Sequence, residues 1–325
     1  MLYPLTFTSI LKPILWGGNK ICPFKEITPI QDGIGESWEI SHIKNNVSVV
    51  ANGFLQGKSL DDLIEIYSTD LLGKKVYERF GKSFPLLIKF IDAKEDLSIQ
   101  VHPDDALAKE RSHANGKTEM WYVIDAAPGT SLHLGFAKQL TTEQYIQSVE
   151  DNSFMDMLVK YDVHPGDVFF LPAGRVHSIG AGCFIAEIQQ TSDITYRIYD
   201  FNRKDAQGNS RELHTELAKD AIDYRVYPDG KLKYTPKKNT IQPLINCPYF
   251  IANLIDLEED KTINLKERDS FSIYICTQGK LSLTDNLGNT IEIHQGQTVL
   301  VPAVTKSITL KPITDCKLLE TYIGN

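Results

Sequence analysis

The sequence has little cysteine, and the residues it has are scattered. No two of them form a Cys-x-x-Cys pair: Cys22, Cys183, Cys247, Cys276 and Cys316. Disulfide-dependent secreted domains and thiolate zinc sites both need cysteines at close, regular spacings. The sequence therefore argues against a disulfide framework and a thiolate zinc site, and it favours a reducing cytoplasm as the compartment.

Long apolar runs, a basic leader and blocks of positive charge are also missing. No apolar stretch approaches the roughly 18 residues that a membrane span requires. The N-terminal segment MLYPLTFTSILKPILWGG carries one lysine and is broken by prolines, unlike a signal peptide. The 34 basic and 42 acidic residues give a net charge of −8. This balance argues against a nucleic-acid or membrane surface, but it is compatible with a small anionic ligand.

Short β-type runs dominate what is present. Runs such as SWEISHI, EMWYVID and FSIYICTQGKLSL alternate with Gly, Pro, Asn and Asp, as in β-sandwiches and barrels. Four stretches have helical spacing instead: 59–81, 104–112, 141–161 and 211–224. A chain of 325 residues is long enough for two domains.

The predicted helices have recognisable ends. Ser59 and Thr141 stand where N-caps belong, and Gly81 follows the last periodic residue of the first helix. Asp104 and Asp105 follow a proline at the start of the second helix. Because acids at a helix N-terminus are favoured by its dipole, we expect these two to stabilise the helix rather than to act in catalysis.

One segment occurs twice. Counted from His164 and His294, HPGDVFFLPAGRVHSI (164–179) and HQGQTVLVPAVTKSI (294–308) align without gaps as far as Ser178 and Ile308, and this alignment places His177 opposite Ser307. We therefore expect one structural unit used twice, whose second copy does not need the histidine.

The polar, proline-interrupted segment 226–244 is interpreted as a linker. The predicted domains are residues 1–230 and 231–325.

Four residues in the first block have the chemistry of a metal site. Gln100 and His102 share one face of a strand in LSIQVHPDD, Glu119 lies in KTEMWYV, and His177 follows a Pro-Ala corner. Two imidazoles, a carboxylate and an amide oxygen suit Zn²⁺ or another borderline divalent metal. Taken singly, each has a simpler explanation: a hydrogen-bonded core residue, or an ion pair between Glu119 and Lys117.

The motifs SIQVHPDD, KTEMWYV, PAGRVHSIGAG and AEIQQTSDITYRIYDF resemble those of the type I mannose-6-phosphate isomerases, in their short bacterial form. The resemblance runs from WGG (16–18) through the C-terminal block. It implies a mainly β fold of two cupin-type jelly-roll domains with a few helices, the second domain without metal. It also implies one Zn²⁺ per chain, bound by the same four residues.

The resemblance further implies an aldose–ketose isomerase that interconverts mannose 6-phosphate and fructose 6-phosphate through a cis-enediol or enediolate. Its catalytic residues would be Arg197, Lys117 and Glu187. The general base stays open among Lys117, Glu187 and a zinc-bound water. From composition alone, Arg197 would instead form a surface ion pair with Asp193 or Asp200.

Binding of the sugar phosphate has weaker signals. No P-loop and no G-x-G-x-x-G is present, so Lys and Arg side chains must bind the phosphate, with Arg175 and Lys117 as candidates. Trp16 and Trp38 are candidates for stacking on the sugar, but packing in the core is the preferred interpretation.

Two other functions remain open. A metal-dependent cupin oxygenase would use a similar ligand set, and a non-catalytic cupin would only bind the sugar phosphate. Oxygen uptake tests the first, and binding without turnover supports the second. The chain is expected to be a monomer or weak homodimer.

Overall fold

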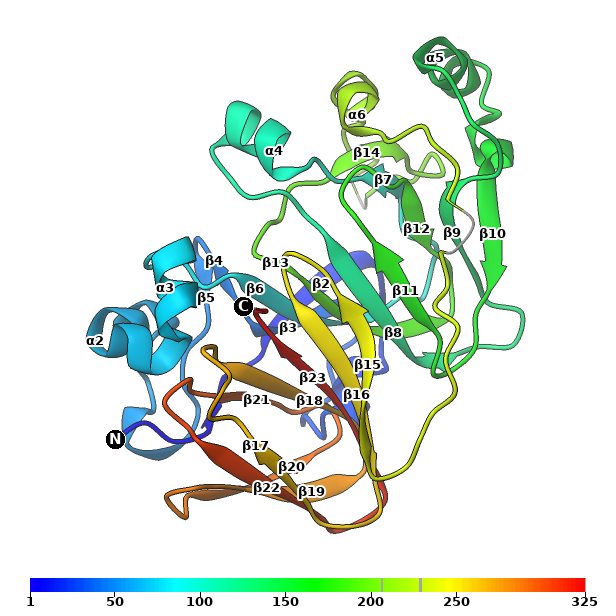
Figure 1. The fold of residues 1–325 in the computed structure, drawn as a ribbon. Coiled ribbons are helices and arrows are strands. Elements are labelled where there is room, and N and C mark those ends of the chain that lie inside the picture. Colours follow the sequence, from blue (N-terminus) through cyan, green and yellow to red (C-terminus); the bar gives the residue numbers. More distant parts are fainter. Residues whose placement is uncertain (206, 228–229, 325) are drawn as a thin grey trace.

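The computed structural model describes residues 1–205, 207–227 and 230–324 and shows two barrels of facing sheets (Figure 1). The large sheet of the first barrel has the order β11 (Val168–Leu171), β8 (Glu119–Ala126), β13 (Cys183–Gln190), β6 (Leu86–Asp92), β3 (Ile34–Ile40) and β2 (Ile10–Gly18). The facing sheet has the order β10 (Leu158–Asp162), β9 (Ser131–Phe136), β12 (His177–Ile179), β7 (Ile99–Val101) and β14 (Tyr196–Tyr199).

The second barrel repeats this plan. Its large sheet has the order β1 (Leu5–Thr6), β21 (Thr298–Val301), β18 (Ser272–Gln278), β23 (Cys316–Tyr322), β16 (Ile251–Leu257) and β15 (Thr240–Asn246). Its smaller sheet has the order β17 (Lys261–Asn264), β22 (Ser307–Pro312), β19 (Lys280–Asp285) and β20 (Thr290–His294). The predicted mainly β fold of two jelly-roll units is confirmed.

The internal repeat is also confirmed, strand by strand. The order β11-β8-β13-β6 in the first barrel corresponds to β21-β18-β23-β16 in the second. In the aligned segments, β11 and β21 begin at Val168 and Thr298, and β12 and β22 begin at His177 and Ser307. Ser307 therefore takes the place of His177 in an otherwise equivalent strand.

The two large sheets pack against each other and share one hydrophobic cluster, which includes Ile88 and Phe90 of β6 and Leu254 of β16. Side chains alternate along a strand, so the residues between those in the cluster point into the first barrel. Lys89 lies between Ile88 and Phe90, and Trp121 of β8 belongs to the separate core of that barrel. This alternation explains how a lysine can occupy a strand whose residues are all buried.

Three of the four predicted helical stretches begin where the sequence predicted, and the stretch 104–112 also ends there. Ser59 and Thr141 form capping boxes at the starts of α2 (Leu60–Leu72) and α5 (Thr142–Glu150), and the Asp104 side chain accepts from Leu107 N at the start of α4 (Asp105–Ser112). The predicted helix 59–81 is two helices, because Gly73 separates α2 from α3 (Lys74–Phe80). Gly73 has a φ of 96°, and a side chain there would meet the Asp269 carbonyl oxygen at 2.3 Å.

Two helix predictions were too long. The segment 141–161 continues from α5 into the 3-10 turn η2 (Phe154–Met157) and then into β10, because strand pairing with β9 overrides its helical spacing. The segment 211–224 is helical only in α6 (Thr215–Ala221). The residues before α6 are instead bonded to Arg197, whose carbonyl accepts from His214 N at 2.6 Å.

The remaining elements are short: α1 (Ile21–Phe24), β4 (His42–Ile43), β5 (Asn46–Val47) and the 3-10 turn η1 (Gly53–Leu55).

The predicted linker 226–244 was too long, because β15 already begins at Thr240. Residues 228 and 229 of this segment lie outside the described part of the chain. All five cysteines are free, as expected. Within the described residues, no helix has the length and apolarity to cross a membrane.

Candidate metal centre and substrate cavity

Neighbouring strands and the facing sheet bring the four predicted metal ligands together. His177 lies opposite Gln100 of β7, and His102 follows the end of that strand. Glu119 begins β8 in the large sheet. Ligand atoms of His102, Glu119 and His177 lie within 4.8 Å of one another, and all three residues are buried. Residues far apart in the sequence thus converge on one point inside the first barrel.

Each histidine has one ring nitrogen held by the backbone. Nδ1 of His102 lies 2.8 Å from the carbonyl oxygen of Ile194, and Nδ1 of His177 lies 2.9 Å from that of Arg175. Because a carbonyl oxygen only accepts, the Nδ1 atoms carry the protons and donate. The Nε2 atoms then present lone pairs 3.6 Å and 3.4 Å from the carboxylate of Glu119. Such backbone support is usual for metal-binding histidines.

Burial keeps these histidines neutral. Together with the ammonium of Lys117, it lowers the pKa of His177 to about 3 and that of His102 well below its ordinary value. Burial also raises the pKa of Glu119, although Lys117 opposes the shift. Neutral imidazoles are the form that binds metals, and a divalent cation would add to the positive charge that Lys117 already supplies to the carboxylate of Glu119.

The donor set fits a metal ion. Among the described residues, Oε1 of Glu119 is buried without a hydrogen-bond partner. Its other oxygen accepts from Lys117 Nζ at 2.5 Å, and the same ammonium lies 3.0 Å from Nε2 of His102, so a cation already contacts two of the donors. The Gln100 amide nitrogen lies 3.2 Å from Nε2 of His177, and a rotated amide would place its oxygen there.

A cavity of about 200 Å³ adjoins this cluster. Gln100 and Lys117 line it and also contact the ligand atoms. Glu187 and Arg197 line the same cavity, so the structure brings all three predicted catalytic residues to one space.

Glu187 is fixed by groups that the sequence analysis did not select. Its Oε1 accepts from Nε1 of Trp121 at 2.9 Å, and Nζ of Lys89 lies 3.3 Å from its Oε2 and 3.6 Å from Oε2 of Glu36. Burial alone would raise the pKa of Glu187, but Lys117 and Lys89 outweigh it and lower that pKa. Oε2 has no well-aligned hydrogen bond within the described chain, so it can accept one from a ligand.

Lys89 and Glu36 are therefore functional candidates that sequence reasoning missed. Burial would lower the pKa of Lys89, but Glu36 and Glu187 raise it above its ordinary value, so the ammonium stays charged. Both residues line the cavity. The available signal was the lone lysine in the apolar run LLIKFID, since charged residues are rarely buried unless they are paired.

Arg197 lies opposite Gln100 on β14. The alternative of a surface ion pair is wrong: Arg211 binds the carboxylate of Asp200, and Arg197 has no ion pair among the described residues. Instead its Nη1 donates to the carbonyl oxygen of Glu212 at 2.8 Å, and its Nε is buried without a partner there. Burial and the neighbouring Arg211 lower the pKa of Arg197.

Arg175, Trp16 and Trp38 differ from expectation in part. Arg175 does not line the cavity, and its guanidinium stacks on the ring of Tyr227 at 4.1 Å, so the structure gives no support for phosphate binding by Arg175. Trp16 and Trp38 are buried, as expected of core residues. Both nevertheless line the cavity, so the core interpretation was incomplete.

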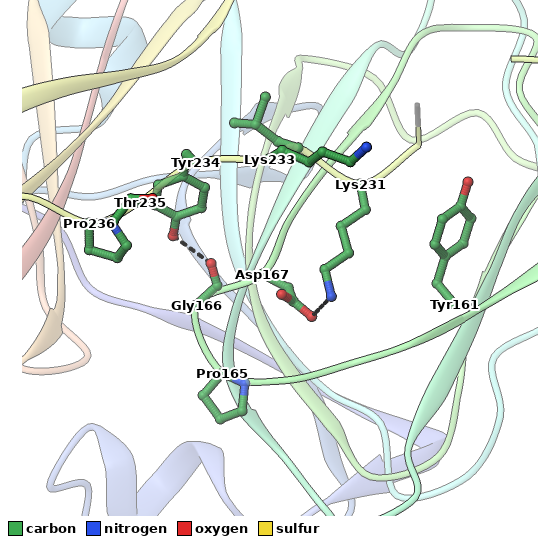
Figure 2. Close-up of a pocket in the computed structure, with 10 residues that line it drawn as sticks. Tyr161, Pro165, Gly166, Asp167, Lys231, Lys233, Tyr234, Thr235 and Pro236 are labelled. Carbon is green, nitrogen blue, oxygen red and sulfur yellow. Dashed lines mark hydrogen bonds and ion pairs between the residues drawn. The ribbon is translucent and has the colours of Figure 1, made fainter. Parts of the chain in front are cut away.

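A larger and more open pocket of about 780 Å³ lies elsewhere, between Pro165–Asp167 and residues 231–236 (Figure 2). There Lys231 pairs with Asp167 at 2.5 Å, and the Tyr234 hydroxyl donates to the Gly166 carbonyl oxygen. Its lining includes none of the metal-ligand candidates or predicted catalytic residues. Size alone therefore does not identify the site, and the smaller cavity carries the relevant chemistry.

Comparison with known proteins gives a consistent result. A family model described as phosphomannose isomerase type I, catalytic domain, matches residues 7–126. Mannose-6-phosphate isomerase of Streptococcus mutans is 41% identical over 317 residues, 94% of this chain and 95% of that protein. ManA of Bacillus subtilis, also named mannose-6-phosphate isomerase, is 35% identical over 85% of this chain and 86% of its own length. A crystal structure of mannose 6-phosphate isomerase from Bacillus subtilis has a TM-score of 0.87 at 30% identity, covering 98% of this chain and 99% of that one.

Proposed function

The chain belongs to the type I phosphomannose isomerases, and from this membership we propose that it interconverts mannose 6-phosphate and fructose 6-phosphate. The observation that carries the proposal is the meeting of the His102, Glu119 and His177 cluster with a cavity lined by Arg197, Lys117 and Glu187. Aldose–ketose isomerisation moves a proton between neighbouring carbons and develops negative charge on an oxygen. The cavity combines groups that can hold a proton with a fixed positive charge.

We propose one zinc ion per chain, held by Gln100, His102, Glu119 and His177. Zinc would supply a Lewis acid for the oxygen on which negative charge develops. With one carboxylate among its ligands, the site keeps net positive charge, because the amide of Gln100 and both imidazoles are neutral. This is the same ligand set that the sequence predicts.

The chain's own residues would handle the proton and the charge. A proton leaves C2 of the aldose, a cis-enediol or enediolate forms, and a proton is delivered to C1. Nζ of Lys117 and Oε2 of Glu187 are our candidates for holding the proton, because both residues line this cavity. The lowered pKa of Glu187 makes its carboxylate a weaker base than an ordinary glutamate. Its Oε2 nevertheless has no well-aligned hydrogen bond within the described chain and can accept one.

Arg197 would stabilise the enediolate. Its guanidinium faces the cavity, and Nε has no partner among the described residues. Burial removes water from the Arg197 guanidinium, and no carboxylate of the described residues forms an ion pair with it. An anionic ligand is therefore bound more strongly by this cation than it would be in water. Three tryptophans form an apolar part of the cavity wall and would reduce the amount of water around the reacting atoms: Trp16, Trp38 and Trp121.

We assign this chemistry to residues 1–230 and propose that residues 231–325 form a metal-free cupin domain. The assignment is supported by the position of Ser307, which has no imidazole to offer where His177 stands in the first barrel.

The test is a coupled assay for fructose 6-phosphate formed from mannose 6-phosphate. It compares zinc-loaded protein, chelator-stripped protein and His177→Ala. We expect turnover only in the zinc-loaded wild type. In D₂O we expect deuterium at C1 of the product, to the extent that the base exchanges the proton from C2 with solvent before it protonates the enediol at C1. Oxygen uptake in place of isomerisation would favour the oxygenase, and tight binding without turnover would favour a sugar-phosphate sensor.

A further inference from the structure

A second arginine lines the cavity beside Arg197. Arg211 comes from the segment that follows β14, and its guanidinium is held by the carboxylate of Asp200 through Nε, at 2.8 Å, and through Nη2. Asp200 is only 5% exposed, so this bidentate pair is anchored in the protein. A guanidinium has five N–H donors, and two of them are used by Asp200. The others remain for a ligand.

The segment that carries Arg211 is fixed against Arg197. Nη1 of Arg197 donates to the carbonyl oxygen of Glu212, and the backbone N–H of His214 donates to the Arg197 carbonyl oxygen at 2.6 Å. The Arg197 N–H in turn donates to Nδ1 of His214 at 3.1 Å. Arg211 is therefore held near Arg197 by bonds at Glu212 and His214, the residues that follow it.

The other cations of the cavity have carboxylate partners. Lys117 pairs with Glu119, and Lys89 lies between Glu36 and Glu187. Arg197 has no ion pair among the described residues. Asp200 is shared by Arg211 and Arg203, the latter at 3.8 Å.

The charge of Arg211 disfavours a charged Arg197, and the carboxylate of Asp200 offsets this only in part, because it is bound to Arg211. The other acid of the cavity wall, Asp193, has an exposed side chain, so solvent screens its charge. The pair Arg197 and Arg211 is therefore the part of the cavity best suited to an anion.

Its place in the fold fits one end of the substrate. His177, Gln100 and Arg197 lie opposite one another on the adjacent strands β12, β7 and β14, and the segment that carries Arg211 is bonded to Arg197 at the end of this row (Figure 1). A hexose 6-phosphate has its reacting carbons at one end and its phosphate at the other. With the reacting end at the metal cluster, the phosphate extends past Gln100 toward the segment that carries Arg211.

We infer that Arg211, positioned by Asp200 and next to Arg197, binds the phosphate group of the sugar-phosphate substrate. The inference rests on the proposed function and names its substrate-recognition residue. Arginine suits this task because its planar N–H fork matches phosphate oxygens. Arg211 thereby determines specificity for the phosphorylated sugar, while Arg197 serves the reacting end.

The test compares Arg211→Gln with Arg203→Gln in zinc-loaded protein. Arg203 is the matched control, because it also faces Asp200 and does not line the cavity. For Arg211→Gln we expect KM for mannose 6-phosphate to rise about 10- to 100-fold, as loss of a charged hydrogen bond predicts. We expect kcat to change less than about threefold and inhibition by inorganic phosphate to weaken in parallel. Arg203→Gln should keep both constants near wild type.

The outcomes separate the inference from the proposed function. An unchanged KM and phosphate inhibition in Arg211→Gln would overturn the inference while leaving the isomerase intact. A wild type without turnover would overturn the function, and calorimetry with mannose 6-phosphate would still test Arg211. If Arg211→Gln has altered metal content or melting temperature, the variant Asp200→Asn is tested in its place. Asp200→Asn keeps Arg211 but weakens the bond that positions its guanidinium. A raised KM with unchanged zinc content then supports the inference, and an unchanged KM opposes it.

Discussion

Glu320 of the second barrel occupies the position that Glu187 occupies in the first. Glu187 lies opposite Trp121 on the neighbouring strand, and Glu320 lies opposite Tyr274 on the corresponding one. In both barrels the aromatic partner donates to the carboxylate, from Nε1 at 2.9 Å in the first and from the hydroxyl at 2.7 Å in the second. The repeat therefore retains a buried carboxylate with its aromatic donor.

What differs is the cation beside it. Nη1 of Arg268 donates to Glu320 at 2.7 Å and to the Ser272 hydroxyl at 2.8 Å. Ser272 pairs with Val301 as Glu119 pairs with Leu171, so it stands where the first barrel has a metal-ligand candidate. The guanidinium of Arg268 thus bridges Glu320 and Ser272. The equivalent positions in the first barrel are Glu187, which lines the cavity, and Glu119, which belongs to the ligand cluster.

Removing this guanidinium is expected to destabilise the protein. In Arg268→Met the carboxylate of Glu320 stays fully buried without its cation, and breaking a buried pair from one side costs about 3–5 kcal/mol. The measurement is the free energy of unfolding from urea titration. Activity per folded molecule should be unchanged.

Lys280→Met is the matched control in the same barrel. Lys280 pairs with Glu292 at 2.8 Å, but both side chains are in contact with solvent, which screens the pair, so the loss of stability should be much smaller than in Arg268→Met. Equal losses in the two variants would contradict a special role for the buried pair.

The fold was predictable because its signals are local. Strand alternation, punctuation by turn residues and the repeat of 164–179 in 294–308 indicated two β units, and the caps Ser59 and Thr141 marked helix starts. Helix ends were harder, because tertiary contacts decide them. The Arg197 carbonyl holds the residues before α6 out of the helix, and nothing in the local sequence shows that bond.

The residues of the candidate site also fall into two groups, those that the sequence could indicate and those that only the structure shows. The candidate metal ligands have distinctive side chains in short motifs, so the sequence could select them, and three of them lie within 4.8 Å of one another in the structure. Lys89, Glu36 and Arg211 were missed because each matters through a partner that the fold brings to it: Lys89 lies between Glu36 and Glu187, and Arg211 binds Asp200. An ordinary lysine or arginine has no signal of its own until the sheets place it in a cavity.

Metal binding should depend on His177 and not on histidine content in general. We expect His177→Ala to lose most bound zinc, and activity with it, because one neutral imidazole donor is removed. His133→Ala is the control: this histidine lies on the adjacent strand β9, opposite Ser178, and is outside the ligand cluster. Metal content by mass spectrometry after dialysis decides the outcome, and equal zinc in both variants would contradict the assigned site.

The cysteines should react slowly in the folded protein. Burial raises the pKa of the Cys183 and Cys276 thiols to about 12 and that of Cys316 to about 11. Since the thiolate is the reactive form, alkylation at neutral pH is expected to be slow and to accelerate about tenfold per pH unit. Cys247 is less buried and should react before these three. Fast labelling of all five without denaturant would contradict the described burial.

Replacement of Arg197 should separate catalysis from metal binding. Arg197→Lys keeps a positive charge but loses the fork of N–H donors, of which Nη1 is bonded to Glu212 O and Nε is free among the described residues. If this guanidinium stabilises the enediolate, kcat should fall about 10²- to 10³-fold, the usual range for loss of a preorganised donor to a developing oxyanion. Zinc content should stay at one per chain, because within the described chain no hydrogen bond or ion pair joins the Arg197 side chain to His102, Glu119 or His177. A rise in KM with unchanged kcat would instead assign Arg197 to binding of the substrate, and the catalytic role would then be untenable.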